Sequence, residues 1–163
     1  EAKQKYEFSI SGPNSAAWEV QCSTVADWSQ LQMQGFLEGG LAIEFSSNRQ
    51  LVCTLMPEGD GKPSKLAMTQ SANDTALNGI MTDGATQIEI SATHKLDTTP
   101  LQVSEPTGYI FRIEGRHIGA VEVINKGTVW LNNSLTPETR SALAATSAVL
   151  LLYQDIKKSG QRK

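Results

Sequence analysis

The sequence predicts a mainly β fold: an antiparallel meander of about ten or more strands that closes into a barrel around one C-terminal hydrophobic α-helix. Three observations lead to this prediction. Apolar residues alternate with polar ones between positions 6 and 131, clusters of Gly, Pro and Asn interrupt the alternation at short intervals, and a strongly apolar helix follows. Because 163 residues suffice for one sizeable core and not comfortably for two, we expect a single domain over 1–163.

The early strands are indicated by a period of two that stops at turn-like sequences such as "SGPNSA", "SSNR" and "TDGAT". Segments 66–69 and 76–81 alternate less regularly, so we expect edge or irregular strands there. The stretch "PEGDGKPSK" (57–65) is expected to be a polar loop tip. The alternating apolar residues of the clearest strands are Tyr6, Phe8 and Ile10, then Leu41, Ile43 and Phe45, then Ile88 and Ile90.

The stretch "GYIFRIEGRHIGAVEVINKGTVWLN" (108–132) predicts three strands joined by two tight turns. The first turn is Glu114-Gly115-Arg116 and the second is Asn125-Lys126-Gly127. In the second turn we expect Gly127 to adopt the left-handed conformation and form a bulge, because glycine takes a positive φ without steric cost.

A helix is predicted over 137–156. Thr136 is suited to be its N-cap, Pro137 fits the first helical position, and the negative charge of Glu138 favours the positive end of the helix dipole. The residues after it, "KKSGQRK" (157–163), are expected to form a solvated, disordered basic tail.

The predicted helix has no clear polar side. At 100° per residue, the large side chains of Leu143, Leu150, Leu151 and Leu152 point in different directions. A helix on the outside of a sheet shows an apolar stripe and a charged face, whereas a helix that is apolar all round is buried all round. We therefore expect the strands to enclose this helix, and about ten strands can form a barrel wide enough to hold one.

The chain resembles the tubby C-terminal-like fold in a strand pair followed by the helix. The stretches that carry the resemblance are "GRHIGAVEV" and "VWLNNSLTPETRSALAATSAVLLLY". Tubby, phospholipid scramblase-like and LURP-one-related proteins share that fold. The resemblance implies a barrel closed around a C-terminal helix and, for parts of the family, lipid binding. The Lys and Arg cluster that binds phosphoinositides has no counterpart here, so no individual residue is assigned from the family. A lipocalin-type barrel ranks lower, because its helix is amphipathic and external.

Composition and charge exclude several classes of function. The net charge is −3 and the Lys and Arg residues are interspersed with acidic ones, so no basic stripe is available for nucleic acid. No apolar run reaches the 18 or so residues that a membrane span needs. A chain that starts at Glu1 fits an export precursor after processing, with a lipid anchor outside the sequence, and it fits a trimmed chain equally well.

The chain has two cysteines, Cys22 and Cys53, and each belongs to an alternating segment whose apolar residues point inward. A disulfide between them would fit an exported protein, and two buried thiols would fit a cytosolic one. Neither cysteine has the spacing of a zinc or redox motif. We slightly favour the disulfide, and with it a location outside the cytoplasm, in the periplasm or cell envelope.

The sequence offers few candidate site residues. Trp28 lies in a polar segment and is the best surface candidate for a ligand contact, whereas Trp18 and Trp130 lie in strand patterns and are expected in the core. His94 follows a strand face and could face a cleft. With only His94 and His117 available and no partner set by spacing, we expect no metal site, no cofactor and no catalytic residue.

The function expected from these observations is a non-catalytic extracytoplasmic binding or scaffold domain, associated with a bacterial envelope, with a protein or small-molecule partner. One alternative is a binder of lipid or another apolar small molecule, of scramblase-like or lipocalin-like kind. A second alternative is a hydrolase centred on His94.

Overall fold

The computed structural model describes residues 4–13, 16–25, 49–70, 76–96 and 99–161, and these form a mainly antiparallel β fold with one C-terminal helix. Within them, nine strands make one sheet, β7 (Lys95–Leu96) and β8 (Thr99–Gln102) pair separately, and α1 (Pro137–Gln161) comes last. In sheet order the nine strands are β1 (Gln4–Ile10), β2 (Trp18–Val25), β3 (Gln50–Pro57), β4 (Ser64–Gln70), β5 (Leu77–Thr82), β6 (Gln87–Thr93), β9 (Gly108–Ile113), β10 (Arg116–Glu122) and β11 (Val129–Leu131).

The late turns form as the sequence predicts. Gly127 has φ +70°, which confirms the left-handed glycine between β10 and β11. Glu114 and Gly115 both have positive φ, 49° and 76°, so a tight turn whose twist matches that of the strands joins β9 and β10. The predicted strand around Leu41, Ile43 and Phe45 lies outside the described residues.

The inner face of the sheet is built from side chains that lie opposite one another in successive ladders. Cys22 lies directly opposite Cys53, and the two form a disulfide, which confirms the pairing that the alternation favoured. The same row crosses six strands from β1 to β6, through Tyr6, Cys22, Cys53, Leu66, Met81 and Ile88.

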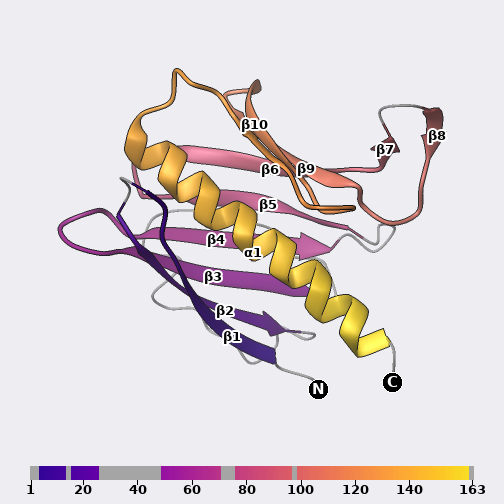
Figure 1. The fold of residues 1–163 in the computed structure, drawn as a ribbon, viewed down its shortest axis with the longest axis horizontal. Helices are drawn as coiled ribbons and strands as arrows, with labels where there is room; N and C mark the ends of the chain where they lie inside the picture. Colours follow the sequence, from indigo (N-terminus) through magenta and orange to yellow (C-terminus); the bar gives the residue numbers. More distant parts are fainter. Residues whose placement is uncertain (1–3, 14–15, 26–48, 71–75, 97–98, 162–163) are drawn as a thin grey trace.

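Helix α1 lies across the inner face of the sheet, diagonal to the strands (Figure 1). Leu143, Val149 and Leu150 are completely buried against the sheet. Two polar contacts fix the helix in place: Trp18 Nε1–H donates to Ser141 Oγ at 2.6 Å, and Thr146 Oγ1 lies 2.8 Å from Met81 Sδ. The core is therefore the space between one sheet face and one helix.

One flank of the helix is less buried than its other sides. Ala144, Ala148 and Leu151 are half-buried and Leu152 is 37% exposed, and at 100° per residue these positions form one flank. Among the described strands, the ladders run from β1 to β11 and do not join these two edges, so closure of the sheet around the helix stays a prediction. What the structure establishes is a large antiparallel sheet with a C-terminal helix on its inner face.

Two further differences from the sequence prediction concern the end of the chain. The helix continues to Gln161, five residues beyond the predicted end at Ile156, so most of the expected basic tail is helical. Lysines near a helix C-terminus interact favourably with the helix dipole, which is consistent with this extension. Trp130 is 53% exposed instead of buried, because it belongs to the short strand β11 at the edge of the sheet.

A cavity at the N-terminal end of α1

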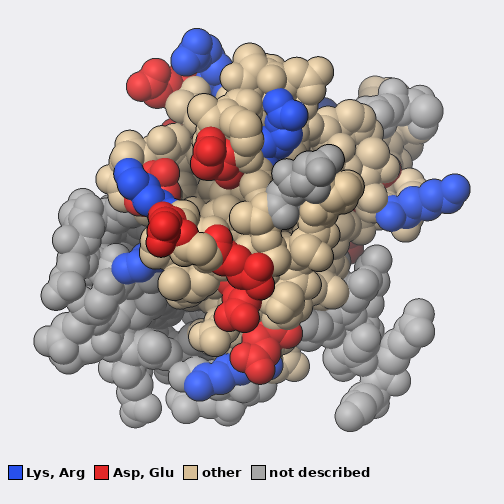
Figure 2. All heavy atoms as spheres, turned by 60° about the vertical axis from the view of Figure 1, so that its left-hand side comes forward, with Lys and Arg blue, Asp and Glu red and all other residues tan. Residues whose placement is uncertain are grey.

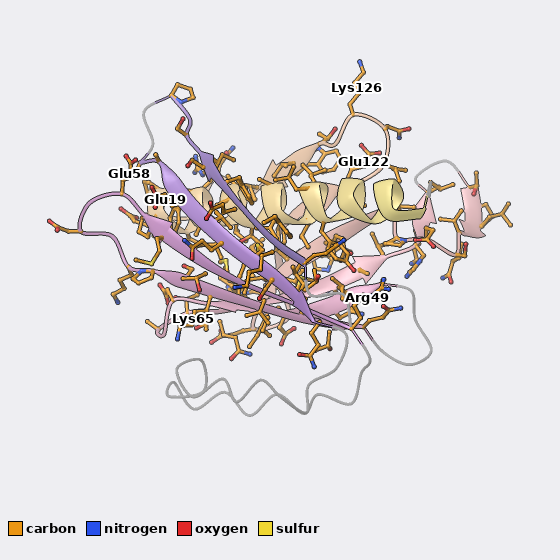
Figure 3. The ribbon with its side chains drawn as sticks, turned by 90° about the horizontal axis from the view of Figure 1, so that it is seen from below. Glu19, Arg49, Glu58, Lys65, Glu122 and Lys126 are labelled. Atoms are coloured by element: carbon orange, nitrogen blue, oxygen red, sulfur yellow. A yellow bond between two sulfur atoms is a disulfide. The ribbon has the colours of Figure 1, made fainter. Side chains whose placement is uncertain are left out.

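A cavity of about 720 Å³ lies where the start of α1 meets one end of the sheet. Its walls come from the start of β2, the β3–β4 hairpin, the β5–β6 turn and the first turn of the helix. Figure 3 shows Glu58, at the base of the β3–β4 hairpin, at this end of the molecule, while Lys126 lies beside the later turns of α1. The volume falls within the range of roughly 300–1,000 Å³ that is usual for small-molecule sites.

The floor of the cavity is apolar and buried. Trp18, Met81, Ile88 and Ala142 line it, and each is at most 6% exposed. Met81 and Ile88 lie opposite each other in the β5–β6 ladder, and Trp18 is held by its hydrogen bond to Ser141, so the floor is set by the strand register and by one helix contact. Such a surface favours an apolar group over water.

Ser64 adds one polar group to this interior. It lines the cavity and is only 2% exposed. A serine hydroxyl can both donate and accept a hydrogen bond, so it could bond to a polar group of a bound molecule.

The rim of the cavity is polar and carries more negative than positive charge. Glu58, Asp83 and Glu138 line it, together with one lysine, Lys62. Glu138 lies in the first turn of α1, whose N-terminus is capped by Thr136 Oγ1, which accepts a hydrogen bond from the Thr139 backbone N–H at 3.2 Å. Figure 2 shows acidic side chains gathered in a band on the face that includes this end of the molecule.

Asp83 is held by its own turn. Its Oδ1 accepts hydrogen bonds from the backbone N–H groups of Ala85 (2.9 Å) and Thr86 (2.7 Å). Partial burial alone would raise the pKa of Asp83, but these hydrogen bonds and the positive charge of Lys62 outweigh that effect, so the pKa lies below its ordinary value. Asp83 is therefore a fixed negative charge at neutral pH.

The residues that the sequence suggested as ligand contacts do not line this cavity. His94 follows β6, and its Nδ1–H donates to the Val103 carbonyl at 3.1 Å. It lies at the far end of β6 from Ile88, roughly 20 Å away at the rise of an extended strand. Trp28 lies outside the described residues. A ligand contact by either residue stays a prediction.

The lining combines an apolar floor, a hydroxyl and carboxylates, which together suit the binding of an amphipathic molecule. Within the described ranges, no three His, Cys, Asp or Glu side chains come together to hold a metal ion. In the same ranges, no helix is both long enough and apolar enough to cross a membrane.

No family model, curated protein or solved structure matches the chain.

Proposed function

We propose that this chain is a non-catalytic binding domain that holds a small molecule with an apolar body in the cavity at the N-terminal end of α1. The observation that carries the proposal is the cavity itself, which combines a volume of about 720 Å³, a buried apolar floor and a polar rim. Sites of this kind bury most of a small ligand and orient it through a few polar groups.

The disulfide supports an extracytoplasmic location for this binding domain. Disulfides persist in the periplasm, at the cell envelope and outside the cell, and they are rare in the reducing cytosol. The association with a bacterial envelope is part of the same proposal. Alkylation of thiols in intact cells, before and after reduction, tests the location: Cys22 and Cys53 are expected to react only after reduction, and reaction of both without reduction contradicts it.

Binding can be tested with N-phenyl-1-naphthylamine, an uncharged apolar probe whose fluorescence rises in apolar surroundings. We expect saturable binding of one probe per chain. Ala16 lies exposed at the rim, so Ala16→Trp fills the opening without disturbing the core and is expected to abolish binding. Gln102→Trp, at an exposed position of β8 away from the cavity, serves as the matched control and should bind normally. Equal binding by both variants would refute the cavity as the site.

Closure of the sheet into a barrel, and with it the resemblance to the tubby C-terminal-like fold, is a further part of the proposal. It is supported by the order of the elements, nine antiparallel strands followed by a helix on their inner face. Closure of the nine described strands requires β1 to pair with β11. In a closed barrel the backbone amides of β1 that do not bond to β2 would be protected from hydrogen exchange, and fast exchange of these amides contradicts closure.

A further inference from the structure

We infer that the ligand of this cavity is an organic cation, an apolar body that ends in a positively charged amine or quaternary ammonium group. This inference rests on the proposed function and adds the charge of the ligand to it. It follows from the order of chemical groups along the cavity. The buried end is apolar, and the open end carries three carboxylates and one ammonium group.

The three carboxylates come from three separate elements that meet around the opening. Glu58 lies at the β3–β4 hairpin, Asp83 in the β5–β6 turn and Glu138 in the first turn of α1. Lys62 acts on Asp83, whose pKa it helps to lower. Among the residues that line the cavity, Lys62 is the one lysine or arginine. Two exposed carboxylates are thus left to face a ligand at the rim.

The N-terminus of α1 does not reverse this preference. A helix N-terminus carries roughly half a positive charge and alone would favour an anion. Here Thr136 already caps a backbone N–H, and Glu138 places a full negative charge in the first turn. An anionic head group at the rim would therefore meet a net negative field, whereas a cationic one would be attracted.

The floor of the cavity fits the same kind of ligand. The indole of Trp18 lines it and offers a large apolar surface to a hydrocarbon body. Ser64 offers one hydrogen bond in the interior. The apolar body thus fills the floor while the charged group remains near the carboxylates and water.

Three detergents with the same ten-carbon tail test the inference below their micelle concentrations: decyltrimethylammonium, decyl maltoside and decyl sulfate. By isothermal titration calorimetry we expect the cation to bind about tenfold more tightly than the uncharged detergent, and the anion to bind most weakly. Raising the salt from about 0.01 M to about 1 M should remove most of this difference, because screening shortens from about 30 Å to about 3 Å.

A pair of double variants locates the charges responsible. Each carboxylate about 6 Å from the cation contributes about threefold in affinity in water, so Glu58→Gln with Glu138→Gln should weaken decyltrimethylammonium about tenfold and leave decyl maltoside unchanged. Glu7→Gln with Glu89→Gln changes the net charge equally at exposed positions outside the cavity and should change neither affinity.

The outcomes separate the two proposals. Binding of the uncharged probes with no preference for the cation, or equal losses in the two double variants, overturns the organic cation and leaves the binding cavity standing. Failure of every detergent and of N-phenyl-1-naphthylamine to bind overturns the proposed function as well.

Discussion

The position of α1 on the sheet can be tested by the same substitution at two nearby positions. Leu150 is completely buried, whereas Leu152, two residues later, is 37% exposed on the outward flank. Leu150→Ala removes fully buried methyl groups and leaves a cavity, which costs about 3 kcal/mol, within the usual range of 2–5 kcal/mol. Leu152→Ala removes atoms that are partly in water and leaves a space that solvent can fill, so we expect a cost of about 1 kcal/mol.

The assay is urea unfolding followed by far-UV circular dichroism, in which the midpoint shifts while the slope stays unchanged if only stability is affected. For a chain of this size, the difference of about 2 kcal/mol between the variants corresponds to roughly 4–8 °C in Tm. Both variants keep the helix, since alanine is a strong helix former. Equal losses at the two positions would show that Leu152 is as buried as Leu150 and would refute the difference in burial between them.

Three further predictions concern the sheet and its turns. Replacing both Cys22 and Cys53 by alanine should lower the free energy of unfolding in urea by about 3.7 kcal/mol, the chain-entropy value for a separation of 31 residues; no change on substitution would contradict it. Gly79→Ala should cost more than about 3 kcal/mol, because a Cβ there would overlap the backbone of β4. Gly84 has φ +90° and open space around it, so Gly84→Ala should cost only about 1 kcal/mol in the same assay. Comparable costs for the two substitutions would refute the close approach of Gly79 to β4. Asp83→Asn keeps a side-chain oxygen in the turn and removes the charge. Because the pKa of Asp83 is lowered in the folded state, the wild type should be more stable than this variant above pH about 5, and the difference in stability should disappear as the pH falls below about 4. A difference in stability that does not depend on pH would contradict the role of the charge.

The strands and turns could be predicted because their signals are local. Alternation placed Cys22 and Cys53 on inward faces, and Gly127 occupies the left-handed position that its turn requires. The alternation could not show the register, that is, which residue of one strand lies opposite which residue of the next strand. Only the pairing of β2 with β3 places the two cysteines directly opposite each other.

The less buried flank of α1 has a signal in the sequence that a count of apolar residues did not show. Ser141, Ala144 and Ala148 share one side of the helix, and these side chains are small enough to face water at little cost. Counting alanine with leucine made the helix look uniformly apolar. Weighting by side-chain size shows that this flank carries small residues beside Leu151 and Leu152.

The cavity could not be predicted from the sequence for a different reason. Its walls come from four segments as far apart as Trp18 and Glu138, and their meeting depends on the ends of two hairpins and on where α1 begins. Trp18 was correctly expected in the core, and it is buried; its second role as cavity floor appears only once Ser141 is placed beside it.

The order of elements along the chain has a consequence for biogenesis. The helix that covers the inner face of the sheet follows all of the described strands in the chain, so it leaves the ribosome after them. At about 5–20 residues per second, roughly 6–26 seconds separate the synthesis of the first strand from that of the helix. During that time the apolar side of the nascent sheet is a substrate for chaperones and a risk for aggregation, and truncation just before Pro137 would make the exposure permanent.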